Sequence, residues 1–211
     1  MRWMVCNMKM SVLNQRYRDL YEALPDDYNE QLNILKSKAK VSDEKLAEYI
    51  NSIENIEWKT LKFSFNVIPQ PACRPRLSNG IFYVEGAKEN WNYVRKIIQD
   101  ADIIHTACKF HVESYFPIPN TMNSVEKILA QMKYIRPTGG GDWDNLGKTY
   151  SDAIQRTLII NDNIIISGTS EKYYCIKPRV DITIEYQVDY DSKYNKRRIE
   201  SSKMYQDIVK N

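Results

Sequence analysis

The sequence predicts an α+β fold, in which helices cover one face of a mixed β-sheet, preceded by an N-terminal helical extension. Three observations lead to this prediction. Apolar residues recur at helical spacing before Trp58, strict strand alternation begins there, and helical segments separate the later strands. We therefore expect a helical extension over residues 1–57, a sheet-containing domain over 58–188 and a polar C-terminal tail over 189–211.

The extension has the periodicity of several helices within residues 11–56. The first has an apolar face formed by Leu13, Tyr17, Leu20, Tyr21 and Leu24. A weaker helix is expected around Leu32 and Leu35. Ser42 is a suitable N-cap for a third, whose apolar stripe comprises Leu46, Tyr49, Ile50, Ile53 and Ile56. Because residues 1–57 carry 8 basic and 10 acidic residues, we expect this segment to serve in packing rather than in DNA contact.

The sheet domain opens with a strand and a hairpin. Alternation with polar residues predicts a half-buried strand from Leu61 to Val67. A loop over 69–76 follows, and Asn79-Gly80 is a strong turn signal that leads into a second strand from Ile81 to Val84.

The remaining elements follow from the same patterns. Helices are predicted over 87–101, from Ser124 as a cap to about Tyr134, and over 144–159. Strands are predicted over 108–116, 164–167, 173–176 and 180–186. The glycine-rich stretch 136–141 is expected to be flexible and without regular structure. From Asp189 onward the chain is polar and is expected to form a mobile tail containing Lys196-Arg197-Arg198.

Composition excludes several classes of protein. With 43% hydrophobic and 27% charged residues among 211, the chain is neither disordered throughout nor collagen-like. We find no apolar run long enough for a membrane span and no secretory signal. Four scattered cysteines, at positions 6, 73, 108 and 175, favour reduced thiols in a cytoplasmic protein. The net charge of +3 is too small to identify a nucleic-acid enzyme by itself.

The most informative run contains Asp142, Asp144 and Lys148, with Asp162 following after the next helix. On an extended chain after the glycines, Asp142 and Asp144 would point to the same side. Asp144 also occupies a suitable N-cap position, and Lys148 lies one turn further along the helix. Three carboxylates and a lysine suit Mg²⁺-assisted cleavage of a phosphodiester, because Mg²⁺ prefers oxygen ligands and lowers the pKa of bound water.

The spacing alone leaves a simpler interpretation open. A lone Asp-x-Asp is more often a solvated loop or a helix cap than a metal site. The run Gly139-Gly140-Gly141 lacks the Gly-Lys-Ser/Thr ending of a P-loop, so nucleoside triphosphate binding is not supported.

The run Gly141-Asp142-Trp143-Asp144-Asn145-Leu146-Gly147-Lys148, then Ser151-Asp152-Ala153 and Asn161-Asp162-Asn163, resembles the RusA family of Holliday junction resolvases. Upstream, Arg74-Pro75-Arg76, the hairpin and the helix with Trp91 resemble the family's basic loop and first helix. The resemblance covers about residues 60–187. It departs from the family at Gly141, where proline is usual, and at Asn161-Asp162, where Asp-Asp is frequent.

The resemblance implies roles for individual residues. Asp142, Asp144 and Asp162 would form the acidic metal site, and Lys148 would be the catalytic lysine. Asp152, four residues after Lys148, and Asn145 would be supporting residues. Arg74, Arg76, Lys172 and Lys177 are candidates for phosphate contacts, although each can equally be a solvated surface charge. Trp143 could stack on a base or pack beneath the site.

The resemblance further implies a Mg²⁺-dependent endodeoxyribonuclease, with Mn²⁺ as a possible substitute, that resolves four-way DNA junctions by paired symmetric nicks. A homodimer would follow from that symmetry. The implied setting is DNA recombination or repair in the cytoplasm of a bacterial or phage-infected cell. Two alternatives remain open: a metal-dependent nucleotidyl or glycosyl transferase that uses the Asp-x-Asp motif, and a non-catalytic relative that binds branched DNA.

Overall fold

The computed structural model describes residues 25–71, 76–78, 81–83 and 87–209. The helix predicted before Pro25, the turn at Asn79-Gly80, the cysteines at 6 and 73, and Arg74 lie outside these residues. The chain divides into two compact units, and the boundary in sequence falls between Asn55 and Ile56. No helix in the described part has the length and apolar content that a bilayer crossing requires.

The described part of the first unit consists of two capped helices, α2 (Tyr28–Ala39) and α3 (Asp43–Glu54). The Asp27 carboxylate caps α2, and the Ser42 hydroxyl accepts the Lys45 N–H at 3.3 Å, as predicted for α3. The apolar stripe of α3 is exposed, with Tyr49 59% accessible. Both predicted helices are therefore confirmed, but the stripe is not buried.

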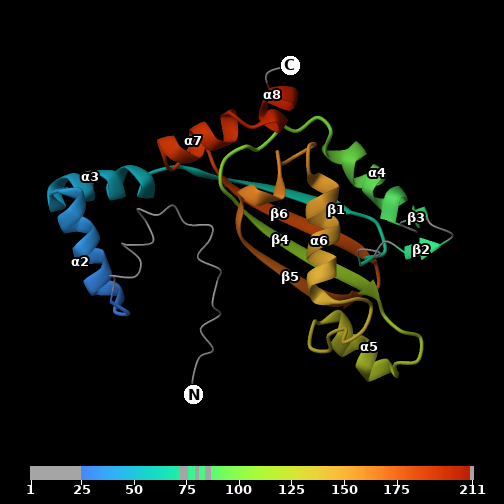
Figure 1. Ribbon diagram of the computed structural model, residues 1–211. Helices are drawn as coiled ribbons and strands as arrows, with labels where there is room; N and C mark the ends of the chain where they lie inside the picture. Colours follow the sequence, from blue (N-terminus) through green and yellow to red (C-terminus); the bar gives the residue numbers. More distant parts are fainter. Residues whose placement is uncertain (1–24, 72–75, 79–80, 84–86, 210–211) are drawn as a thin grey trace. The chain divides into compact units, whose positions relative to one another are not determined.

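The second unit contains a mixed sheet, as predicted, and this sheet has four strands (Figure 1). Its strands are β1 (Trp58–Phe65), β4 (Cys108–Pro117), β5 (Ile165–Cys175) and β6 (Arg179–Gln187), in the spatial order β1-β6-β4-β5. β6 is antiparallel to both of its neighbours, whereas β4 and β5 are parallel. The parallel pair places the start of β5 beside the start of β4, which fixes where Asp162 enters the sheet.

The predicted hairpin is present as a separate two-stranded sheet of β2 (Arg76–Ser78) and β3 (Ile81–Tyr83). Ser78, the last residue of β2, pairs with Ile81, the first residue of β3. The helix α4 (Ala87–Ile98) follows.

Two helices, α4 and α6 (Trp143–Ile154), cover one face of the sheet, and Figure 1 shows α6 running across β4 and β5. Alternate residues of the strands point into this layer, since side chains of a strand alternate between faces. The centre of the core includes the fully buried side chains of Phe65, Val94, Ile98, Val112, Tyr150, Ile154, Ile182 and Ile184. This packing holds α6, which carries Asp144 and Lys148 of the predicted site, on the sheet.

The opposite face of β4 and β5 carries aromatic and charged side chains. Tyr115 and Tyr173 stack with their ring centroids 5.2 Å apart. The Arg179 guanidinium lies 3.7 Å from the Tyr115 centroid, and that of Arg136 lies 3.8 Å from the Tyr173 centroid. Each cation–π contact of this kind contributes about 0.5–1 kcal/mol when it is exposed.

Three predicted boundaries were wrong for local reasons. Asn123, not Ser124, caps α5 (Ser124–Gln131), because Asn123 and Glu126 form a reciprocal capping box. The predicted strands 164–167 and 173–176 are one strand, β5, whose exposed polar middle hides the apolar alternation. α6 ends at Ile154 rather than at residue 159, because Gln155 leaves the helix with an extended ψ of 140° and Arg156 follows with a left-handed φ of 63°.

The expected mobile tail was also wrong. Residues 193–209 form α7 (Lys193–Glu200) and α8 (Lys203–Val209). Tyr205 is 8% exposed within the main core, and Ile199 and Met204 pack against it. The sequence conceals this because the apolar residues are shared between two short helices with a break at Ser201 and Ser202, so no single helix shows a full apolar stripe.

Candidate active site

A cavity of about 390 Å³ lies where α6 crosses the exposed half of β5. Three of the predicted site residues, Asp144, Lys148 and Asp162, line it together. The other lining residues are Phe110, Trp143, Gly147, Ser151, Ile165, Gly168, Thr169 and Ser170. Residues 18 positions apart in sequence therefore share one open site.

The start of α6 presents both carboxylates of the Asp-x-Asp motif to solvent. The helix begins at Trp143 with Asp142 as N-cap, so the predicted cap at Asp144 and the extended backbone between the two acids were wrong. The Asp142 side chain makes no capping hydrogen bond and instead accepts the Asn145 amide at 3.2 Å. Asp144 lies in the first turn, where the helix dipole favours negative charge.

Trp143 and Ser170 join the start of α6 to β5. The Trp143 indole N–H donates to the Ser170 carbonyl, and the Ser170 hydroxyl donates to the Trp143 carbonyl at 3.0 Å. Ser170 is buried, whereas Trp143 remains 59% exposed. The reciprocal pair sets the position of Asp144, the next residue, above the strand.

Lys148 is paired with Asp152, as predicted from their spacing. The Lys148 ammonium lies 3.3 Å from an Asp152 carboxylate oxygen. Gln155 donates to the same carboxylate at 3.1 Å, and Arg95 donates to the Ala153 carbonyl at 3.0 Å. These bonds hold the last turn of α6 and keep Asp152 in place beside the lysine.

Asp162 lies in a short 3₁₀ turn, η2 (Asp162–Ile164), directly before β5. The Asn161 side chain accepts the Asn163 N–H at 3.0 Å and caps this turn. Ile164 is buried in the main core, which fixes the turn while Asp162 stays exposed at the cavity.

The glycine loop before α6 has no regular structure, as predicted, but it is held in place. The Lys172 ammonium donates to the carbonyls of Gly139 and Gly141 at 3.3 and 3.2 Å. Gly140 and Gly141 have φ values of 80° and 112°. A proline, which requires φ near −65°, cannot adopt the conformation that residue 141 has in this structure.

The carboxylate oxygens of the candidate site are chemically suitable ligands for a divalent cation, because Mg²⁺ prefers oxygen ligands of this type. Asp144 and Asp162 line the cavity, and the Asp142 carboxylate is not used as a cap. Among the described residues, however, no three acidic, histidine or cysteine side chains are close enough together to hold an ion. The three-carboxylate site thus stays a prediction.

The structure does not bring every predicted residue to the cavity. Lys177 lies in the turn after β5, and roughly 30 Å of strand, at about 3.3 Å per residue, separates it from Asp162. Lys172 lies between them and contacts the glycine loop. Arg76 belongs to β2, a strand of the separate hairpin.

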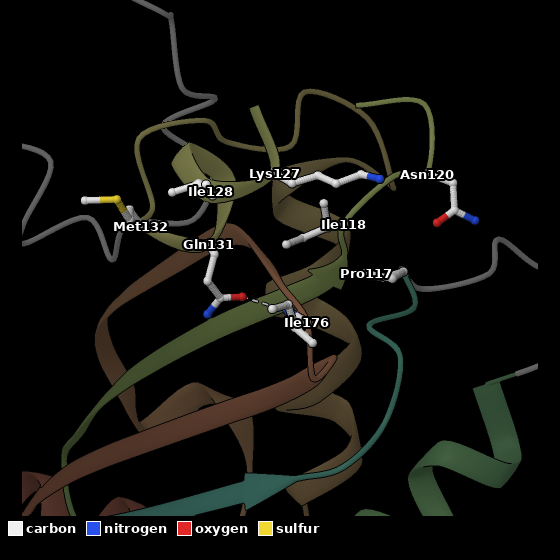
Figure 2. Close-up of a pocket in the computed structure, with 8 residues that line it drawn as sticks. All are labelled: Pro117, Ile118, Asn120, Lys127, Ile128, Gln131, Met132 and Ile176. Atoms are coloured by element: carbon white, nitrogen blue, oxygen red, sulfur yellow. Dashed lines mark hydrogen bonds between the residues drawn. The ribbon is translucent and has the colours of Figure 1, made fainter. Parts of the chain in front are cut away.

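A second cavity, of about 460 Å³, lies at the far end of the sheet (Figure 2). It is mostly apolar, and its lining includes Ile128 of α5, Met132 directly after α5, and Ile176 beyond β5. The Gln131 side chain accepts the Ile176 N–H at 2.9 Å across it. Its lining includes no carboxylate, so it offers none of the groups that phosphodiester cleavage requires.

Sequence reasoning missed the part of the cavity wall that β5 supplies. Gly168, Thr169 and Ser170 line the cavity, but they lay between the two predicted strands. An added Cβ at Gly168 would lie 2.8 Å from the Phe110 carbonyl oxygen, so a glycine is required where β5 approaches β4. A glycine within polar residues resembles a loop signal, which explains the error.

The fold and the site together define an α+β domain with an exposed acidic cavity between a helix and a sheet edge. A family model described as "Endodeoxyribonuclease RusA" matches residues 65–185, which is more than half of the chain. The chain therefore belongs to the RusA family, a family of endodeoxyribonucleases, and DNA cleavage is the activity this membership assigns to it. No curated protein matches the sequence.

Proposed function

We propose that this protein is a divalent-metal-dependent endodeoxyribonuclease that cuts branched DNA, with the four-way junction as its substrate. The observation that carries the proposal is the shared cavity of Asp144, Lys148 and Asp162 within the region that the family model matches. An open site suits a duplex backbone, which a closed pocket would exclude.

The carboxylates of Asp144, Asp162 and Asp142 would hold the cation, Mg²⁺ or its substitute Mn²⁺. Such an ion supplies an activated water and balances the charge that develops on the phosphate. The Lys148 ammonium adds a positive charge next to the leaving oxygen. Asp152 keeps that ammonium in position, and Asn145 orients the carboxylate of Asp142.

Positive residues around the cavity would position the DNA through its phosphates. Lys172 also holds the glycine loop, so its substitution would disturb Asp142 as well as DNA contact. We retain Arg74, Arg76 and Lys177 as candidates for contacts with DNA arms more distant from the cavity.

Two nicks of the same polarity at a symmetric junction require two sites related by a two-fold axis, so we propose a homodimer. The products would be nicked duplexes with 5′-phosphate and 3′-hydroxyl ends, which a ligase can seal. The proposed role is the processing of recombination or repair intermediates in the cytoplasm of a bacterial or phage-infected cell.

The decisive experiment is cleavage of an end-labelled synthetic four-way junction with Mg²⁺, compared with a linear duplex and with chelated metal. Asp144→Asn should lower the cleavage rate by at least about a hundredfold, because a charged group at the reacting phosphate is lost. It should still bind the junction, since neutralising a carboxylate that faces phosphates removes repulsion.

Asp100→Asn is the matched control, because Asp100 is exposed on the surface away from the cavity. Full activity in Asp144→Asn would refute the site assignment. Junction binding without any cleavage by the wild-type protein would instead favour the second candidate, a non-catalytic relative that binds branched DNA. The observation that favours this candidate is that, among the described residues, no three potential metal ligands lie close enough together to hold an ion.

A further inference from the structure

The helix α7 carries an unusual density of positive charge. Its eight residues include Lys193, Lys196, Arg197 and Arg198 and one acid, Glu200. All four basic side chains are exposed. Within the described part of the chain, none of the four lies within 4.0 Å of a carboxylate oxygen, whereas Lys148 and Arg179 elsewhere in this unit are paired. This charge is therefore available to a partner.

The spacing places three of these charges in one row. Lys193, Lys196 and Arg197 lie at positions i, i+3 and i+4, which share a helix face. Together with Glu200 and Ser201 they line a shallow surface concavity of about 400 Å³. A row of unpaired cations along a groove is complementary to a nucleic-acid backbone, which carries about one negative charge per 1.7 Å of duplex.

The helix lies next to the turn that carries Asp162. A small cavity of about 200 Å³ has Asn163 and Ile164 on one side and Asn195 and Arg198 of α7 on the other. The Asn161 amide also contacts the Met204 sulfur of α8 at 3.7 Å. The turn therefore borders the face of α7 that carries Asn195 and Arg198, whereas the row of Lys193, Lys196 and Arg197 lies on the opposite face of the helix.

The charged row is held in place rather than carried on a loose tail. Ser192 caps α7 by accepting the Asn195 N–H at 3.1 Å. Ile199 and Met204 pack against the main core, which contains Tyr205. The position of the α7 backbone relative to the turn that carries Asp162 is thus set by core packing, so the helix does not have to fold when a ligand binds.

We propose that α7 binds the phosphate backbone of one arm of the DNA substrate as that arm leaves the candidate active site. This inference rests on the proposed function, because the nearness of α7 to Asp162 selects DNA over an acidic protein. The family model ends at residue 185, so α7 is a binding surface added outside the matched region.

The test is the salt dependence of junction binding by the full chain, measured by fluorescence anisotropy with chelated metal, so that no cleavage occurs. The variant is the double substitution Lys196→Gln and Arg197→Gln. The matched control is Lys59→Gln with Lys62→Gln, which removes two exposed cations from β1, the edge strand farthest from β5. Thermal unfolding verifies that both variants are folded.

The α7 variant should bind roughly tenfold more weakly at about 0.15 M salt. The slope of log affinity against log salt should fall by about 1.8, or 0.9 for each phosphate that is no longer neutralised. The β1 control should match the wild type. If the α7 variant has the affinity and the salt slope of the wild type, the inference about α7 is wrong, even if the wild-type protein cleaves junctions. If the α7 variant binds more weakly but the wild-type protein never cleaves junctions, the inference stands and only the proposed nuclease function is wrong.

Discussion

The Lys148 ammonium and the Asp152 carboxylate are 3.3 Å apart on α6, one helical turn from each other. Lys148 is 61% exposed and Asp152 23%. An exposed pair of this kind contributes only about 0.3–0.5 kcal/mol to folding. Its importance is therefore positional, because it directs the lysine that lines the cavity with Asp144 and Asp162.

Asp152→Asn should lower the rate of junction cleavage roughly three- to tenfold, with the melting temperature nearly unchanged, because the lysine loses its partner. Lys148→Met should lower the rate further. In the Lys148→Met background, Asp152→Asn should add little, since the coupling is removed. Single-turnover cleavage by the four proteins measures this. Additive losses would show that Asp152 acts independently of Lys148.

Gly168→Ala should destabilise the protein by about 1–3 kcal/mol, because the new methyl group would lie 2.8 Å from the Phe110 carbonyl oxygen within the β4–β5 pair. Gly147→Ala is the control. Its methyl group would lie 3.5 Å from the Ser170 Cβ, and alanine favours a helix interior by up to about 1 kcal/mol. Urea unfolding should show a lower free energy of unfolding for Gly168→Ala and a higher one for Gly147→Ala, relative to the wild type.

Gly141→Pro, which introduces the residue usual in the family, should reduce both stability and cleavage. Residue 141 has a φ of 112°, which proline cannot adopt, and an added Cβ would lie 2.7 Å from Pro71. Gly139→Ala, with nothing within 4 Å, is the control and should behave as the wild type. A wild-type melting temperature in the proline variant would show that the loop has another stable conformation.

The contact of His105 with the C-terminal helices should make stability depend on pH. Burial lowers the pKa of His105, although Glu200 opposes the shift. His105 bonds the Tyr190 hydroxyl at 2.8 Å and meets the edge of the Tyr205 ring. Because the folded state binds the His105 proton less tightly than the unfolded state does, the free energy of unfolding is highest with neutral His105, above pH about 6.5. It falls as the pH drops below that value.

Thermal unfolding at pH 7.5 and 5.5 checks this expectation. The wild-type protein should lose stability on acidification by at most about 1.4 kcal/mol per pH unit from this one group. His105→Gln, which cannot titrate, should lose less over the same interval. An equal loss in both proteins would show that other groups determine the pH dependence.

The two cysteines of the described region should differ in reactivity. Burial raises the pKa of the Cys108 thiol to about 12. Burial acts in the same direction on Cys175, but the Lys177 N–H, Gln131 and Arg179 outweigh it and lower the pKa of that thiol. At pH 8, iodoacetamide should modify Cys108 more slowly than Cys175, by a factor on the order of a hundred or more. Peptide mass mapping resolves the two sites, and equal labelling would contradict the expectation.

Much of the architecture follows from the sequence because it depends on local patterns. Alternation from Leu61 to Val67 is enough to locate β1, and the Ser42 hydroxyl is enough to start α3. The predicted pairing of Lys148 with Asp152 also holds, because helical geometry fixes neighbours four residues apart.

The errors arose where distant segments decide the structure. β5 is a single strand because β4 pairs along its whole length, despite the polar middle. The C-terminal helices exist because Tyr205 enters a core built by residues far away in sequence.

By itself, the sequence determined most of the elements, the Asp-x-Asp motif and the lysine one turn beyond it, because each depends on residues a few positions apart. Only the tertiary structure decided that Asp162 shares a cavity with Asp144, that Lys172 holds the glycine loop, and that α7 borders the turn that carries Asp162. Those relationships arise from the pairing of β4 with β5 and from burial of the C-terminal helices, which join segments that no local pattern connects.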